Sequence, residues 1–235
     1  MKVIDLLFPR NIRCFVCGVE CEELGVCDFC YPKLNWIQGD ICEKCGGPKV
    51  GKSKVCLDCK SRDYYFYKNF CIFKYEDIIQ RNIIKFKNGG GKYLGEVFAY
   101  FIKNAVKAIR VDFDVIIPVP IHETRLKERG FNQSEILSSK LDEYNVDNKI
   151  LIRIVDTPHQ TGLDRENREE NLLNAFDVLD KDKVKGKTVL LIDDIYTTGS
   201  TINECAKTLV KCGASMVYSL CLARAPMTKK ENFVK

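Results

Sequence analysis

The clearest change from apolar to polar positions lies between residues 188 and 213, where a hydrophobic run meets two acids, a hydroxyl-rich turn and an amphipathic stretch. The run from Thr188 to Ile192 is rich in β-branched residues and leucine, which is typical of a central strand buried on both faces of a parallel sheet. Asp193 and Asp194 follow at its carboxyl end. Beyond the turn, apolar residues recur at helical spacing until Gly213, which suits the left-handed position after a helix. The pattern predicts a strand, a loop and a helix.

Similar patterns predict further strands and helices along the rest of the chain. Strands are expected at residues 70–75, at 114–122, where the strand runs into a loop, and at 149–155. Helices are expected at residues 78–86 and 93–109, the second with the strongest helical periodicity in the chain. Strands that alternate with helices are typical of an α/β fold, a mostly parallel sheet flanked by helices.

Paired cysteines mark the first quarter of the chain. Four CxxC pairs form an internal repeat of two units: Cys14 with Cys17, Cys27 with Cys30, Cys42 with Cys45, and Cys56 with Cys59. A tetrahedral zinc ion held by sulfur needs two such pairs. We therefore predict two structural Zn2+ ions in a double zinc ribbon at residues 1–65, ahead of a second domain at residues 66–235. Sequential pairing of the CxxC pairs is simplest, and a crossed pairing stays open.

Disulfides and a redox CxxC are the alternatives to zinc. Four pairs without a surrounding βαβ pattern favour metal in a reducing compartment. The second ribbon is basic, which allows contact with nucleic acid, although a metal-stabilised module that packs on the other domain or on a partner is the favoured interpretation. Its basic residues are Lys44, Lys49, Lys52, Lys54, Lys60 and Arg62.

Composition narrows the class of protein only moderately. The 235 residues are 46% apolar and 29% charged, with a net charge of +5, which suits phosphate ligands but falls short of a dedicated basic nucleic-acid binder. No apolar run is long enough to span a membrane, and the first ten residues contain an acid and a proline where a signal peptide would have its apolar core. We expect a cytoplasmic protein.

The hydroxyl-rich turn is a candidate phosphate site. Residues 197–201, TTGST, precede a predicted helix whose free N–H groups and positive dipole end attract anions. No lysine stands where a Walker loop requires one. The carboxylates of Asp193 and Asp194 would repel a second phosphate, but they accept hydrogen bonds from sugar hydroxyls. A ribose 5-phosphate is the ligand that fits both features.

Basic residues follow the second predicted strand at the same edge of the sheet, where they can meet a diphosphate. Asn132 and Glu135 in this segment also form a capping box, so a structural role for Asn132 is an equal alternative. Gly89, Gly90 and Gly91, flanked by lysines, are consistent either with an anion site or with a flexible loop. The basic residues are Arg125, Lys127 and Arg129, and the flanking lysines are Lys85, Lys87 and Lys92.

Two segments resemble known families. VLLIDDIYTTGST resembles the motif of type I phosphoribosyltransferases that binds phosphoribosyl pyrophosphate (PRPP), and PVPIHETRLKERGFNQSEIL resembles a signature of the ComF family of late-competence proteins. The ComF resemblance extends from the cysteine pairs to residue 224. It also includes Gln160, Leu163, Arg168 and Asn171, the Gly186-Lys187 pair, and Leu222-Ala223-Arg224.

This resemblance implies a type I phosphoribosyltransferase fold that binds PRPP together with Mg2+. It implies that PRPP contacts Asp193, Asp194, Tyr196, Thr197, Thr198, Gly199, Ser200 and Thr201, and that Arg125, Arg129 and Arg168 act as electrostatic catalytic groups. It further implies a loop near residues 157–171 that closes over the site. The acceptor and catalytic competence stay open. The alternatives are a non-catalytic PRPP sensor, a competence factor that binds single-stranded DNA or other DNA-uptake proteins, and a zinc-stabilised adaptor.

Overall fold

The central sheet of the described chain has four parallel strands in the order β1-β6-β5-β2. The computed structural model describes residues 13–21, 25–89, 92–156, 172 and 174–226. The central strands are β1 (Lys68–Lys74), β2 (Val115–Pro118), β5 (Thr188–Tyr196) and β6 (Met216–Arg224), while β3 (Leu151–Arg153) and β4 (Phe176–Val178) form a separate antiparallel pair. The predicted α/β fold with a mostly parallel sheet is confirmed.

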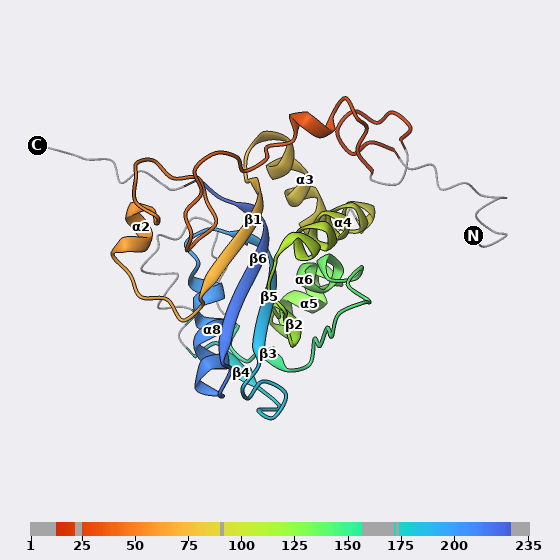
Figure 1. Cartoon of the computed structure of the whole chain (residues 1–235). Helices are drawn as coiled ribbons and strands as arrows, with labels where there is room; N and C mark the ends of the chain where they lie inside the picture. The colour runs from red at the N-terminus through yellow and green to blue at the C-terminus, as the bar shows by residue number, and fades with distance from the viewer. Residues whose placement is uncertain (1–12, 22–24, 90–91, 157–171, 173, 227–235) are drawn as a thin grey trace, which may run out of the picture.

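Helices cover both faces of this sheet. They are η1 (Tyr31–Lys33), α2 (Leu57–Lys60), α3 (Asp77–Lys87), α4 (Lys92–Ala108), α5 (Glu123–Arg129), α6 (Gln133–Leu137) and α8 (Ser200–Lys211). In Figure 1, α8 lies on one side of the sheet and α4, α5 and α6 lie on the other. None of the helices in the described ranges is long and apolar enough to cross a membrane.

Alternation along the strands divides the buried side chains into two hydrophobic clusters, because successive strand residues point to opposite faces. Leu190 and Ile192 belong to the cluster built with α3, α4 and α6. Val189 and Leu191 belong to the cluster built with α8 and the β3–β4 pair. The central strand β5 is therefore buried on both faces, as its composition predicts.

The two cysteine units pack on opposite faces of the sheet. Residues 14–30 join the α4 cluster, where the rings of Phe15 and Phe98 meet edge-on with 5.9 Å between centroids. Residues 42–59 join the α8 cluster through all four of their paired cysteines. Figure 1 shows the first unit in red beside α3 and α4, and the second, in orange, on the α8 side. Of the two expected contacts for the second ribbon, with the other domain or with a partner, the structure shows the first.

Residues 123–129, which we expected as a loop, form helix α5. The side chain of His122 caps this helix, since its Nδ1 accepts a hydrogen bond from the Thr124 N–H at 3.3 Å. Gly130 ends the helix with a φ of 77°. Histidine is not among the preferred capping residues, so the sequence carried little signal for this start. The cap predicted at Asn132 is confirmed, because its Oδ1 accepts from the Ser134 N–H at 3.0 Å and begins α6.

Candidate functional site

Both acids of the predicted site lie inside strand β5 rather than beyond its end. We expected the strand to stop at Ile192, but β6 continues beside it, so that Asp193 pairs with Cys221 and Tyr196 pairs with Arg224. Pairing with β6 therefore extends the ladder past the acids. Asp193 and Asp194 still line one cavity at this edge of the sheet.

Asp193 is held by two hydrogen bonds to one carboxylate oxygen. Its Oδ1 accepts from the Asp194 N–H at 2.9 Å and from Ser134 Oγ at 3.3 Å. Burial, followed by the negative charge of Asp194, raises the pKa of Asp193 to about 7. The carboxylate therefore gains from any ligand that donates hydrogen bonds to it.

This raised pKa predicts a pH-dependent stability. An aspartate in the unfolded chain has a pKa of about 3.9. Between about pH 4 and pH 7 the folded chain therefore holds a proton that the unfolded chain releases, and the free energy of unfolding falls as pH rises through this window. Asp193→Asn is expected to raise the free energy of unfolding above pH 7 by about 2–4 kcal/mol, since each pKa unit corresponds to about 1.4 kcal/mol.

Urea unfolding of parent and variant across this pH range measures the effect as the difference between the two profiles, which removes contributions from all other groups. The exposed Asp180→Asn is the matched control and should follow the parent. Parallel profiles for Asp193→Asn and parent would contradict the prediction.

Lys87, at the end of α3, forms an ion pair with Asp194, with 2.8 Å between Nζ and Oδ2. The sequence was consistent with either an anion site or a flexible loop around this lysine. The structure places Lys87 in the cavity with both acids. Its Nζ is thus available to exchange a carboxylate for a phosphate oxygen. Gly90 and Gly91 lie outside the described residues.

The predicted phosphate loop connects β5 to α8. Gly199 takes a φ of +83°, and a Cβ there would lie 2.1 Å from the Tyr196 hydroxyl, so glycine is required on both counts. Thr198 Oγ1 lies 2.7 Å from Ser200 Oγ. The side chain of Tyr196 is buried beneath the loop, which leaves only its backbone for the ligand contact implied by the resemblance.

The two ends of this loop face one cavity, and its middle residues face another. Thr197 and Thr201 line the cavity that contains the acids, which has a volume of about 740 Å³. Thr198, Gly199 and Ser200 line a smaller depression of about 360 Å³ beside the second cysteine unit. The backbone of the loop therefore separates the two.

Three arginines converge on the larger cavity. Arg125 and Arg129, both candidate site residues from the sequence, come from α5, and Arg153, which was not among those candidates, comes from β3. Burial lowers the pKa of Arg125, and the charge of Arg129 adds to this effect. Burial likewise lowers the pKa of Arg153, with a further contribution from Arg125. A basic residue near the end of a predicted strand was the available signal for Arg153.

Gln133 adds a donor to this group. Its Oε1 accepts from Arg129 Nη1 at 3.1 Å, while its Nε2 is buried without a hydrogen-bond partner among the described residues. A buried amide donor that lines a cavity without an acceptor is costly unless a ligand supplies one. Arg168, the third predicted catalytic arginine, and the loop at residues 157–171 lie outside the described residues.

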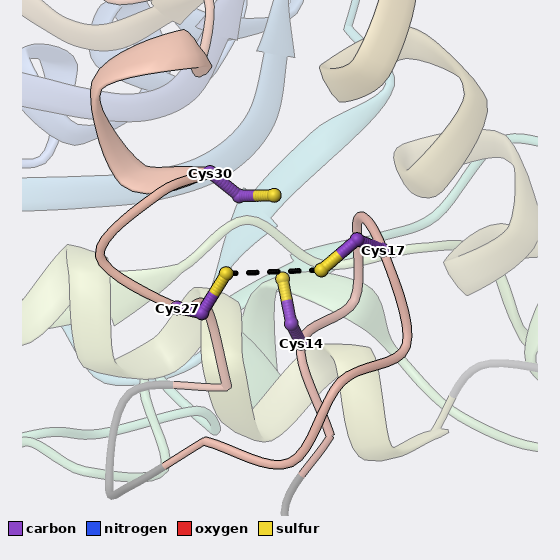
Figure 2. A group of neighbouring side chains, drawn as sticks. All are labelled: Cys14, Cys17, Cys27 and Cys30. Atoms are coloured by element: carbon purple, nitrogen blue, oxygen red, sulfur yellow. Dashed lines mark hydrogen bonds between the residues drawn. The ribbon is translucent and has the colours of Figure 1, made fainter.

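The paired cysteines gather into two clusters with sequential pairing. Cys14, Cys17, Cys27 and Cys30 form one, and Cys42, Cys45, Cys56 and Cys59 form the other; within each, all sulfur atoms lie within 4.8 Å of one another. Figure 2 shows the four side chains of the first cluster directed toward a common centre. The simpler pairing is the one that the structure adopts.

The spacing of the sulfur atoms fits tetrahedral zinc. A Zn–S distance of about 2.3 Å requires sulfur atoms about 3.8 Å apart. Cys17 and Cys27 are 3.7 Å apart, and Cys45 and Cys56 are 3.9 Å apart. The Cys56 N–H also donates a hydrogen bond to Cys42 Sγ at 3.2 Å, which holds these two ligands together. Both clusters therefore suit structural Zn2+.

Two zinc ions per chain are the expected result of elemental analysis on freshly purified, reduced protein. The four remaining cysteines of the second domain lie in strands or at a helix and pack as apolar residues, so replacing them should leave the zinc content unchanged. They are Cys71, Cys205, Cys212 and Cys221. A count of one zinc or fewer would contradict the assignment.

The fold and the two clusters together define a phosphoribosyltransferase domain joined to a double zinc ribbon. Residues 126–233 match the family model described as a phosphoribosyl transferase domain, and residues 3–60 match the model of a double zinc ribbon domain. The chain belongs to the ComF family of competence proteins, as two relatives show.

Competence protein F of Haemophilus influenzae is 30% identical over 227 residues, which cover 92% of this chain and 98% of that protein. Competence protein ComFC of Bacillus subtilis is 31% identical over 210 residues, covering 85% and 84%. The DNA utilization protein YhgH of Escherichia coli K12 is 27% identical over 221 residues, covering 90% and 96%. The solved allosteric regulatory enzyme of purine biosynthesis aligns at 17% identity over 54% of this chain and 25% of that one, with a TM-score of 0.37.

Proposed function

We propose that this chain binds PRPP together with Mg2+ and transfers the phosphoribosyl group to an acceptor, in the service of DNA uptake. One observation carries the proposal: a single cavity of about 740 Å³ is lined by both acids, by both ends of the phosphate loop and by three arginines. The names of the relatives, competence protein and DNA utilization protein, support the link to DNA uptake. Reduced cysteine clusters favour a cytoplasmic location.

Each part of PRPP has a complementary partner in this cavity. The 5-phosphate suits Thr197 and Thr201 at the two ends of the loop and the first turn of α8, whose N–H groups have no partner within the helix. The ribose hydroxyls suit the carboxylates of Asp193 and Asp194. The diphosphate suits Arg125, Arg129 and Arg153, because an anion relieves the repulsion among these charges, and it offers an acceptor to Gln133.

The proposed reaction breaks the C1–O bond of PRPP, and the electron pair leaves with the diphosphate. The ribose carbon passes through an oxocarbenium-like state and forms a bond with a lone pair of the acceptor. The arginines stabilise the charge that develops on the diphosphate, and the acids hold the ribose in place. No nucleophile or dedicated acid from the protein is needed.

The donors at the cavity fit Mg2+, which prefers hard oxygen ligands such as carboxylates and phosphates. Asp193 and Asp194 supply the carboxylates. Bound with the ligand, the ion would neutralise part of the diphosphate charge. The two cysteine clusters take no part in the proposed reaction step.

Titration calorimetry with PRPP and Mg2+, followed by a screen of bases, amines and nucleic acids for diphosphate release, tests the proposal. Saturable binding with acceptor-dependent release is the expected result. Binding without release would instead identify a PRPP sensor, and the absence of binding would overturn the proposal as a whole.

Arg153→Gln is expected to weaken PRPP binding by about 10- to 100-fold, because a charge-assisted hydrogen bond contributes about 1.5–3 kcal/mol. The exposed Arg110, which follows α4 and lines a different cavity, provides the matched control as Arg110→Gln. Calorimetry measures the PRPP affinity of both variants. Equal affinities would remove Arg153 from the diphosphate site.

Binding of single-stranded DNA is the second candidate function. Tyr65 and Tyr67 are 49% and 59% exposed beside Arg62 and Lys68, and aromatic rings next to cations can stack successive bases. Fluorescence anisotropy with a labelled oligothymidylate, at several salt concentrations, tests this function independently of PRPP.

A further inference from the structure

Arg224 lies between the phosphate loop and the second cysteine cluster. It is the last residue of β6 and only 5% exposed. Its Nη1 donates to the carbonyl oxygens of Thr197 at 2.8 Å, Tyr196 at 3.3 Å and Ala225. A buried cation thus binds the backbone at the point where β5 becomes the loop.

The same side chain is in contact with the second cluster. A Cβ on Gly47, two residues after the ligand Cys45, would come within 3.1 Å of the Arg224 side chain. Cys45, Gly47 and Arg224 also line one small cavity. A zinc ion bound by four thiolates carries a net negative charge, so the cluster attracts this guanidinium.

Tyr196 forms a second connection between the two sites. The Arg224 guanidinium lies 4.8 Å from the centre of the Tyr196 ring, and Phe66 packs edge-on against that ring at 6.3 Å. The opposite end of Tyr196, its hydroxyl, lies directly beneath Gly199 of the loop. The ring is buried in the same hydrophobic cluster as Cys45.

The cysteine pair itself is fixed to the sheet. Buried Asn69 donates from Nδ2 to the carbonyl oxygen of Cys45 at 2.8 Å, and its Oδ1 accepts from Ser219 Oγ at 2.7 Å. Gly46, with a φ of +69°, permits this approach, since a Cβ there would lie 2.6 Å from the Asn69 carbonyl oxygen. A change in the cluster is therefore transmitted to Arg224 rather than absorbed by a loose loop.

We propose that the second cysteine cluster sets the shape of the phosphate loop through Arg224, so that metal at this cluster and PRPP at the loop bind cooperatively. The inference rests on the proposed function, because it requires PRPP at the loop. Coupling between two sites is reciprocal: if metal strengthens PRPP binding, PRPP strengthens metal binding by the same factor.

The test measures zinc release from the full-length parent protein to a colorimetric chelator, with and without saturating PRPP and Mg2+. Release from the second cluster is expected to slow by about 10-fold, within the usual range of coupling between sites, while release from the first cluster stays unchanged. The variant Cys17→Ser, which removes one ligand of the first cluster, assigns the two kinetic phases.

Arg224→Gln should bind PRPP about 10-fold more weakly and lose the slowing of zinc release, with the zinc content still at two. Arg224→Lys keeps a cation with N–H donors and should restore part of both effects, which a merely structural role would not produce. The matched control is Lys74→Gln, since Lys74 pairs with Arg224 in the sheet and lines the same small cavity. This control should behave as the parent.

If the parent binds PRPP by calorimetry but releases zinc at the same rate with and without it, the coupling is refuted and the proposed function stands. If the parent does not bind PRPP, both fail together. Should Arg224→Gln fail to fold, the measurements on the parent and on Arg224→Lys still test the coupling between the two sites.

Discussion

Replacing both Asp193 and Asp194 with asparagine is expected to abolish measurable PRPP binding while the fold survives. Asparagine keeps the size of each side chain but removes the charge, and two charge-assisted hydrogen bonds at about 1.5–3 kcal/mol each correspond to a loss of at least about 100-fold in affinity. The fold should persist because Asp193 is more stable protonated in the folded chain and because Lys87, which loses its partner, can turn toward solvent. Titration calorimetry measures the loss, and circular dichroism checks the fold.

The exposed pair Asp180 and Asp182, both replaced with asparagine, makes the matched control, since it removes the same charge from a surface turn. This control should bind PRPP as the parent does. If the Asp193 and Asp194 double variant also binds as tightly as the parent, the acids serve the structure alone and the assignment of the ribose site is wrong.

Removing both zinc ions is expected to unfold the whole described chain, not only the ribbons. Structural zinc contributes about 10–16 kcal/mol in small zinc-binding peptides, which is comparable with the entire stability of a typical domain at about 5–15 kcal/mol. Here cysteines of the first unit belong to the hydrophobic cluster around α4, and cysteines of the second unit belong to the hydrophobic cluster around α8. Thermal unfolding followed by circular dichroism should show one cooperative transition that disappears after treatment with a strong chelator in excess Mg2+.

The opposite outcome of this experiment would show that the second domain folds without zinc. A chelated protein that keeps a transition near the temperature of the parent would show that residues 66–235 fold without the ribbons, as the boundary predicted near residue 65 allows. Cys212→Ser, a half-buried cysteine outside both clusters, controls for loss of a thiol and should melt as the parent does.

Local features of the site were predictable from the sequence. The strand, loop and helix around Gly199 depend on hydrophobic periodicity and on a turn that needs glycine, both of which act over a few residues. The spacing within the four CxxC pairs predicted them as zinc ligands, whereas the structure decided which pairs share a cluster. The N-cap at Asn132 was predictable because the capping box spans only four positions in the sequence.

Features that depend on distant segments were not predictable in this way. Strand β5 extends past Ile192 only because β6 continues beside it, and helix α5 begins at a histidine cap with weak sequence signal. Lys87 and Arg153 join Asp194 in one cavity although they come from separate parts of the chain. The hydrophobic periodicity of a single segment does not indicate any of these contacts with distant segments.

What the sequence determined by itself, then, was every relation set by neighbours along the chain: the strands near residues 70–75, 114–122, 149–155 and 188–192, the turn at Gly199 and the four CxxC pairs. Only the tertiary structure decided that one cysteine unit packs on each face of the sheet, and that Arg224 joins the second unit to the phosphate loop. The physical reason is that burial on both faces of one sheet brings these groups together, and such contacts depend on the shape of the whole core rather than on local spacing.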